Sequence, residues 1–308
     1  MLNRNGGEIV AEEREKVIEV RNVKKVYRMG SERITAVEEV SFDIYKGEFC
    51  CLLGTSGSGK STLLNLMAGI EKLTSGQIII KGKNIHKMSE KNLAKFRQKY
   101  LGFVFQSYNL MNSMTALENV EFPLVFKRIP PKRRKKMARD MLIKVGLKTR
   151  LEHKPKQMSG GQQQRVGIAR AFVAKPEIVF ADEPTGNLDT KTTMEVMELI
   201  REVARDNNQT IVMVTHDRRL AEFADKIIHI LDGKIQSIDL LNPDVKMDKE
   251  SVEETQEPEL IKEDLEVKEE KKEEKEEKED SNIQSSDVIQ SEITEIRDVE
   301  ESSAATTE

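Results

Sequence analysis

One short stretch, residues 54–62, constrains the fold of this chain more than any other part of the sequence. It reads Gly-Thr-Ser-Gly-Ser-Gly-Lys-Ser-Thr, which matches the phosphate-binding pattern of a glycine, any four residues and then Gly-Lys-Ser or Gly-Lys-Thr. An apolar run at 49–53 precedes it, and a helix-forming run at 63–68 follows it. Because the pattern requires this strand–loop–helix context, the sequence predicts a loop that wraps a nucleotide's phosphates between a buried strand and a helix.

The residue types in this loop are suited to binding phosphate and a metal ion. Glycines let successive backbone N–H groups turn inward toward phosphate oxygens, and the N-terminus of the following helix adds partial positive charge. Lys60 is expected to reach the β- and γ-phosphates, and the Ser61 hydroxyl is expected to ligate Mg²⁺. We therefore predict that ATP contacts the whole loop, which consists of Gly54, Thr55, Ser56, Gly57, Ser58, Gly59, Lys60, Ser61 and Thr62.

Charge is unevenly distributed along the chain. Residues 241–308 hold 25 acidic and 9 basic side chains, a net of −16, so residues 1–240 carry +12 if the whole chain of 308 residues carries −4. Within 268–280 no residue is apolar, so this segment has no surface with which to build a core. The sequence predicts a flexible leader at 1–16, a folded domain at 17–240 and an acidic, disordered tail at 241–308.

Three further features bear on the compartment of the chain. The only cysteines, Cys50 and Cys51, are adjacent in an apolar run and are typical of small core residues in a reduced, cytosolic protein. No apolar run approaches the roughly 18 residues that would span a bilayer. The acidic residues Glu8, Glu12 and Glu13 do not fit a signal peptide. We therefore expect that the chain does not enter a membrane by itself.

Strand-like and helical segments alternate after the phosphate loop. Apolar runs at 101–105, 177–181, 210–215 and 226–231 predict buried strands, and an amphipathic pattern predicts a helix at 192–207. Polar residues follow the first three of these runs directly. Since such alternation indicates a mainly parallel sheet, those polar residues are expected to meet at its carboxyl edge, where α/β proteins bind ligands.

The polar residues at the strand ends belong to motifs that occur in a fixed order. Residues 158–165, Met-Ser-Gly-Gly-Gln-Gln-Gln-Arg, resemble the signature sequence of the ATP-binding-cassette ATPases, with Met for the usual Leu, and residues 178–183 resemble their Walker B strand. The Q-loop, D-loop, switch histidine and A-loop of that family are matched by Gln106, Asn187-Leu188-Asp189, His216 and Tyr27. The resemblance covers about residues 17–236. It implies an α/β fold with a P-loop NTPase core, an antiparallel β subdomain and a helical signature subdomain at about 107–175.

Finer similarity points to one branch of this family. Residues 102–106, 115–120 and 182–189 resemble the lipoprotein-release and macrolide-export ATPases. Those proteins work as dimers beneath integral membrane permease subunits with large extracytoplasmic domains. The acidic tail lies outside this pattern.

The resemblance also implies a role for each matched residue. The metal ligands would be Ser61, Gln106 and Asp182. Glu183 would be the general base that polarises the attacking water, with Gln106 completing the site and His216 donating a hydrogen bond to the γ-phosphate. Tyr27 would stack on adenine. These assignments make Glu183, His216 and Gln106 the predicted catalytic residues.

The signature motif is expected to act on a different nucleotide from the phosphate loop of its own chain. Ser159, Gly160, Gly161 and Gln162 open a helix and so form a second anion site. In the family this site faces the phosphates bound by a second subunit, so two ATP molecules are enclosed in a two-fold homodimer. Asp189 would then lie at the subunit interface.

These features lead to one expected function and two alternatives. The expected function is the ATP-hydrolysing subunit of a membrane transporter or a related force-transmitting complex, cytoplasmic and peripheral on the inner face of the cell membrane. The resemblance disfavours a soluble ATPase acting on nucleic acid, the ribosome or an assembly scaffold. Ribosome-acting members of the family usually carry two cassettes and this chain has one, and DNA-repair members insert a long coiled coil where only 99 positions separate Lys60 from Ser159 here. A non-catalytic nucleotide-binding module is disfavoured because Glu183 and His216 are both present.

One run stays open to two interpretations. Residues 127–136 hold seven basic side chains in ten. Such a density fits a solvated helix face, or a surface that contacts anionic lipid head groups or an acidic partner.

Overall fold

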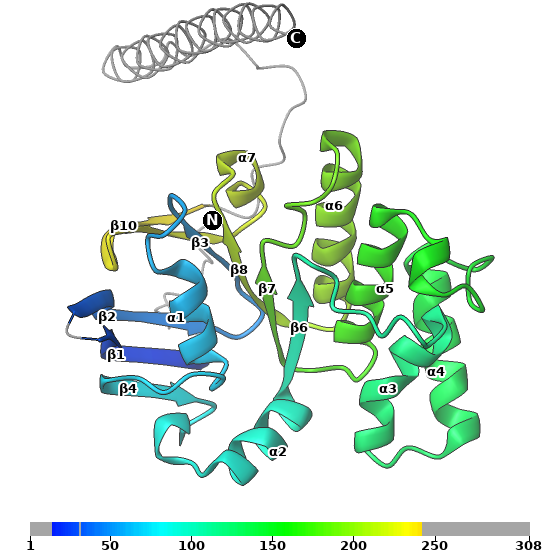
Figure 1. Ribbon diagram of the computed structural model, residues 1–308, viewed down its shortest axis with the longest axis horizontal. Helices are drawn as coiled ribbons and strands as arrows, with labels where there is room; N and C mark the ends of the chain where they lie inside the picture. Colours follow the sequence, from blue (N-terminus) through cyan, green and yellow to red (C-terminus); the bar gives the residue numbers. More distant parts are fainter. Residues whose placement is uncertain (1–13, 31, 242–308) are drawn as a thin grey trace, which may run out of the picture. The chain divides into compact units, whose positions relative to one another are not determined.

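The computed structural model describes residues 14–30 and 32–241 (Figure 1). Most of the predicted leader, and all of the predicted tail after Leu241, lie outside the described residues. None of the helices in the described ranges is long and apolar enough to cross a membrane.

A six-stranded sheet forms the centre of the fold. Its spatial order is β10 (Lys234–Leu240), β9 (Lys226–Leu231), β3 (Phe49–Leu53), β8 (Thr210–Thr215), β7 (Ile178–Asp182) and β6 (Leu101–Phe105). Neighbours from β9 to β6 run parallel, and only β10 pairs antiparallel, at the edge. Every residue of β3 and β8 is buried, which explains their uninterrupted apolar character. The predicted mainly parallel sheet is confirmed.

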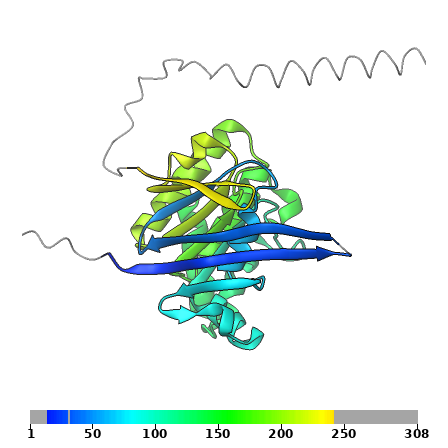
Figure 2. The ribbon, with the colours of Figure 1, turned by 90° about the vertical axis from the view of Figure 1, so that its left-hand side faces the viewer.

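A smaller, antiparallel sheet has the order β2 (Glu32–Tyr45), β1 (Lys16–Met29), β4 (Ser75–Ile80) and β5 (Lys83–Asn84). Figure 2 shows β1 and β2 side by side along their length. Both strands extend beyond the apolar alternation at 17–20 and 37–44 of the sequence. Residues 32–35 of β2 are exposed and residues 24–27 of β1 are only partly buried, so these parts carry no apolar alternation.

The helices join these strands. In chain order they are α1 (Lys60–Met67), α2 (Glu90–Tyr100), α3 (Ala116–Phe126), α4 (Pro131–Lys144), α5 (Gly160–Phe172), α6 (Thr190–Asp206) and α7 (Arg218–Ala221). Single 3₁₀ turns occur at Ile85–Lys87 and Pro155–Gln157. Helix α2 buries only Leu93 and Phe96, so its sequence gives little helical periodicity.

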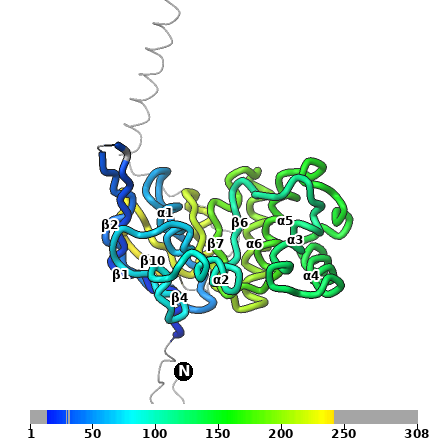
Figure 3. The backbone as a smooth tube through the Cα atoms, turned by 60° about the horizontal axis from the view of Figure 1, so that its bottom comes forward, coloured from blue at the N-terminus to red at the C-terminus, as the bar shows by residue number. Residues whose placement is uncertain are grey.

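Helices α3, α4 and α5 pack on one another beyond strand β6 (Figure 3). Pro123 lies inside α3, although a proline within a helix removes a backbone hydrogen bond and usually breaks the helix. The helix persists there because a Thr115–Glu118 capping box fixes its start and because Leu117, Val120 and Leu124 are buried. The break falls instead at Pro130 and Pro131, where α4 begins.

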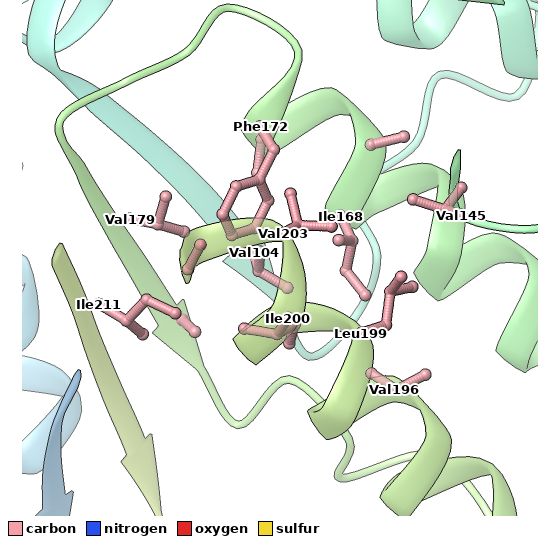
Figure 4. Close-up of a cluster of buried hydrophobic side chains, with 14 of the residues drawn as sticks. Val104, Val145, Ile168, Phe172, Val179, Val196, Leu199, Ile200, Val203 and Ile211 are labelled. Atoms are coloured by element: carbon pink, nitrogen blue, oxygen red, sulfur yellow. The ribbon is translucent and has the colours of Figure 1, made fainter. Parts of the chain in front are cut away.

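Side chains from the two faces of the large sheet enter two separate cores. On β7, Val179 and Ala181 join one cluster, whereas Ile178 and Phe180 join the other, as expected from the alternation of side chains along a strand. Figure 4 shows the first cluster, in which Phe172 of α5 and Val203 of α6 lie near the sheet. The sheet is thus covered on both faces, and its carboxyl edge is left for the polar residues.

Candidate functional site

The phosphate loop follows β3 and ends at the first turn of α1. Gly59, the residue before α1, has φ +96°, and a Cβ at this position would lie 2.1 Å from the Ala36 carbonyl oxygen. Only glycine fits there. The loop folds around the Lys60 amine, which donates to the Thr55 carbonyl at 2.5 Å and lies 3.4 Å from the Ser58 hydroxyl. Burial lowers the pKa of Lys60, while the charges of Glu183 and Asp182 act in the opposite direction.

The loop is joined to strand β7 by one hydrogen bond. The Ser61 hydroxyl donates to Asp182 Oδ1 at 2.9 Å. Burial raises the pKa of the Asp182 carboxyl, and the Ser61 hydrogen bond opposes this shift. A hydroxyl and a carboxylate are oxygen donors of the kind that Mg²⁺ prefers. Across the described ranges no three His, Cys, Asp or Glu side chains are grouped to hold a metal ion, so an ion at this pair would need further oxygen ligands.

Glu183 and His216 lie together beyond the ends of β7 and β8. Glu183 has φ +41° and is held by a 3.0 Å hydrogen bond from its backbone N–H to the Val214 carbonyl. Its Oε1 is 3.1 Å from His216 Nδ1. Both residues line a cavity of about 480 Å³ whose other walls include Leu53 of β3 and residues 54–56 of the phosphate loop. A carboxylate and an imidazole therefore face the same space as the start of the loop.

Gln106 follows β6 and lies beside the turn that follows β7. Its backbone carbonyl accepts a 3.1 Å hydrogen bond from Asn187 Nδ2. A Cβ on Gly186 would lie 2.6 Å from Gln106 Nε2, so the amide packs directly against this turn. The predicted Q-loop and D-loop residues are thus in contact.

Tyr27 stands on β1 of the smaller sheet. Its hydroxyl donates to Glu71 Oε2 at 2.5 Å, and Lys25 Nζ lies 4.7 Å from its ring centroid. Burial is the main cause that raises the pKa of Tyr27, and Glu71 adds to the shift. The position of the ring is therefore fixed by a carboxylate shortly after α1.

The predicted signature residues lie at the start of α5. The Ser159 hydroxyl accepts from the Gln162 N–H at 3.4 Å, and Gln162 Oε1 accepts from the Ser159 N–H at 3.2 Å. This capping box satisfies two N–H groups of the helix start. None of residues 159–162 is among the described residues that line the 480 Å³ cavity. The signature residues therefore do not border the cavity that the start of the phosphate loop enters.

The first turn of α5 packs closely on neighbouring segments. A Cβ on Gly160 would lie 2.8 Å from the Tyr108 hydroxyl, and one on Gly161 would lie 2.7 Å from Thr192 Cγ2. Asp189 caps α6 by accepting from the Thr192 N–H at 3.0 Å and from its hydroxyl at 2.6 Å. These bonds to Thr192 lower the pKa of Asp189. The signature and D-loop segments are therefore packed together through Thr192.

Three residues near these groups were not predicted from the sequence. Glu71 holds Tyr27, and Arg218 and His229 line the cavity beside the phosphate loop. His229 also pairs with Asp239 at 2.8 Å. No local pattern marks these residues, since their positions follow from which strands and loops become neighbours.

Comparison with known proteins identifies the family. The family model described as ABC transporter matches residues 37–186. An uncharacterized ABC transporter ATP-binding protein of Thermotoga maritima is 46% identical over 224 residues, which cover 73% of this chain and 95% of that protein. The chain belongs to the ABC transporter ATP-binding proteins.

Other members of this family include longer proteins and solved cassettes. The macrolide export ATP-binding/permease protein MacB of Vibrio parahaemolyticus is 40% identical over 235 residues, but the match covers 76% of this chain and only 36% of MacB. A dimeric structure of the ATP-binding cassette MJ0796 in a post-hydrolysis state, bound to ADP and Pi, has a TM-score of 0.69 and 41% identity. It covers 73% of this chain and 99% of that one, and MJ0796 is a protein of Methanocaldococcus jannaschii. The family resemblance and the fold class predicted from the sequence are confirmed.

Proposed function

We propose that this chain is the ATP-binding and ATP-hydrolysing subunit of an ABC transporter, and that it works as a two-fold dimer. One observation carries this proposal. The Lys60 loop, the Ser61–Asp182 hydrogen bond and the Glu183–His216 pair converge at the carboxyl edge of one sheet. A cation, a pair of hard oxygen donors and a carboxylate next to an imidazole are the groups that phosphoryl transfer to water requires.

The phosphate loop, Tyr27 and the Ser61–Asp182 pair would bind the nucleotide and its metal. Backbone N–H groups of residues 54–62 would donate to the phosphates once the Lys60 amine exchanges the Thr55 carbonyl for phosphate oxygens. Tyr27 would present its ring to adenine. Ser61, Asp182 and Gln106 would hold Mg²⁺, which when bound neutralises the charge on the β- and γ-phosphates.

Glu183 and His216 would carry out the hydrolytic step. Glu183, held at the cavity wall by its backbone bond to Val214, would accept the proton of the attacking water. His216, 3.1 Å from that carboxylate, would orient it and donate to the γ-phosphate. Gln106 would hold the water in line from the neighbouring strand end.

A second copy would supply Ser159, Gly160, Gly161 and Gln162. The Ser159 hydroxyl accepts from the helix N–H and so keeps its own proton free to donate to an anion. Since these residues do not border the cavity beside the phosphate loop of their own chain, a two-fold partner is the natural source of the anion. Asp189, at the start of the adjacent α6, would lie at the same interface. The MJ0796 cassettes, which are dimeric in their solved structures, support this arrangement.

A groove between α2, β6 and α3 would receive the membrane subunit. It has a volume of about 550 Å³, and its lining includes Phe103, Phe105, Phe122 and Phe126. An apolar hollow of this size on the surface of a single chain is typical of a protein-binding site. Because β6 leads directly to Gln106, a segment bound here would sit next to the proposed catalytic site. The partner would be an integral permease subunit with an extracytoplasmic domain, and the chain would lie on the cytoplasmic face of the membrane.

The purified full-length chain provides the direct test. It should hydrolyse ATP only when Mg²⁺ is supplied, and Lys60→Ala should lose both ATP binding and hydrolysis. Lys91→Ala, which removes an exposed lysine of α2, should change neither. ATP binding that is unaffected by Lys60→Ala would contradict the proposed site.

A further inference from the structure

The basic run 127–136 divides into two sets of side chains in the folded chain. Lys127 turns inward and donates to the Ala174 carbonyl at 2.7 Å, and Arg134 pairs with Glu121 at 3.1 Å. The other five are exposed, and none has a carboxylate within 4.0 Å in the part of the chain that the structure describes. These five form the α3–α4 basic patch: Arg128, Lys132, Arg133, Lys135 and Lys136.

This clustering does not serve the stability of α4. Lys132 and Arg133 occupy its first turn, where no acidic residue is present and where no side chain caps the helix. The helix dipole is positive at this end, so basic residues there are unfavourable. Repulsion among neighbouring basic side chains adds to this cost. The charge therefore fits an external anionic partner better than an internal role.

Apolar side chains border the patch. Val125 and Phe126, the last residues of α3, are 44% and 57% exposed. Phe126 is held in an edge-to-face pair with Phe122, whose ring centroid lies 5.0 Å away. An exposed aromatic ring beside lysines and arginines is the arrangement by which proteins bind the interface of an anionic bilayer.

We propose that the α3–α4 basic patch, together with Val125 and Phe126, binds the surface of a membrane that contains anionic phospholipids. The acidic run 268–280 of this chain is another source of negative charge, but it contains no apolar residue and offers nothing for Phe126 to enter. The position of the patch also favours a membrane as its partner. Phe126 also lines the groove proposed to receive the membrane subunit, and the α3–α4 connection and α2 lie at the same end of the view in Figure 1.

The inference rests on the proposed function only in placing the protein at a membrane, so it is tested without ATP turnover. The full chain is sedimented with phosphatidylglycerol vesicles and with phosphatidylcholine vesicles. It should bind only the first kind, and less tightly at high salt. The variant Lys132→Gln/Lys136→Gln, which neutralises two exposed charges one turn apart, should bind phosphatidylglycerol vesicles roughly 30-fold more weakly, since each basic residue near such a surface contributes about fivefold. The matched variant Lys148→Gln/Lys156→Gln, which removes two exposed lysines that follow the opposite end of α4, should bind like the parent.

Two further measurements separate a lipid surface from an acidic polypeptide. Phe126→Ser should weaken binding to the vesicles but not to soluble polyglutamate. If the Lys132/Lys136 variant loses affinity for polyglutamate but not for vesicles, the partner is a protein and the proposal is wrong. Equal vesicle binding by the patch variant and its matched control would also overturn it. ATP hydrolysis in solution, measured on the two double lysine variants, should equal that of the parent, so a failure of the proposed ATPase function would be seen separately.

Discussion

The Glu183 carboxylate lies 3.1 Å from His216 Nδ1, although 33 positions separate the two residues in the chain. Strands β7 and β8 are parallel neighbours, so the residues that follow them meet at one edge of the sheet. The carboxylate therefore has a fixed neighbour and a fixed direction before any nucleotide binds.

Glu183→Gln should retain ATP binding and lose most hydrolysis. The amide keeps the size of the side chain but cannot accept a proton, and general-base assistance is typically worth about 10²–10⁴-fold. The variant should accumulate as an ATP-bound dimer in size-exclusion chromatography. As a control, Glu195→Gln alters an exposed carboxylate of α6 that pairs with Arg165 and should turn over like the parent. Near-normal turnover by Glu183→Gln would remove this residue from the role.

Ser159→Arg should abolish dimerisation driven by ATP, because the long side chain would crowd the phosphate site of the partner. Measured on the Glu183→Gln background, ATP affinity of the monomer should stay nearly unchanged, since its own phosphate loop is intact. The substitution also removes a helix cap, worth about 1 kcal/mol. Ser159→Asp keeps the cap and instead repels the phosphate, so it should give the same loss. Dimers in either variant at the parental level would rule out the two-site arrangement.

Tyr27→Ala and Tyr27→Phe should differ in nucleotide affinity. Phenylalanine keeps the ring and removes only the hydrogen bond to Glu71, so its ATP affinity should resemble that of the parent. Alanine removes the stacking surface, for which losses of about 1–3 kcal/mol per base are typical. Titration with ATP and with inorganic triphosphate distinguishes the cause, because the triphosphate has no base to stack. A similar loss for both ligands would place Tyr27 outside the adenine site.

Removal of residues 242–308 should leave folding and ATP hydrolysis intact. Strand β10 ends at Leu240, and the Leu241 N–H donates to the Asp225 carbonyl at 2.9 Å, so the cut should fall after Leu241. An earlier cut near Asp239 would remove the partner of His229. Loss of hydrolysis in the truncated chain would contradict the predicted domain boundary.

The same truncated chain tests whether the acidic segment screens the basic one. Screening predicts tighter binding to anionic vesicles after truncation, with a gain that fades as salt shortens the Debye length from about 10 Å at 0.1 M to about 3 Å at 1 M. Equal binding of the two chains at low salt would mean that the segment is passive.

The sequence predicted best the elements whose signal is local. The runs at 101–105, 210–215 and 226–231 match β6, β8 and β9 residue for residue, because most residues of these strands are buried and the apolar run ends where burial ends. Strand β10 was not predicted. All of its last five residues are exposed at the edge of the sheet, so its sequence carries no apolar run. Strand β6 lies at the other edge, but helices α2 and α5 pack against it, so burial and not the position in the sheet produces the apolar pattern.

The residues of the candidate site likewise divide into those that the sequence could locate and those that it could not. Motif residues such as Lys60 and Ser61 could be located because the loop binds phosphate through its own backbone. The contact between Tyr27 and Glu71, 44 positions apart, could not be predicted, because it depends on how the smaller sheet packs against the end of α1. The cavity-lining residues Arg218 and His229 come from separate segments for the same reason.

The left-handed backbone of Glu183, with φ +41°, has a consequence for protein engineering. A side chain in this conformation costs roughly 1–2 kcal/mol compared with the ordinary helical region, and glycine would avoid that cost. A search for thermostable variants would therefore favour Glu183→Gly, and its success in a melting experiment would coincide with an inactive enzyme. Activity and thermal resistance are opposed at this one position, so a stabilised version of this protein should be selected by turnover rather than by melting temperature.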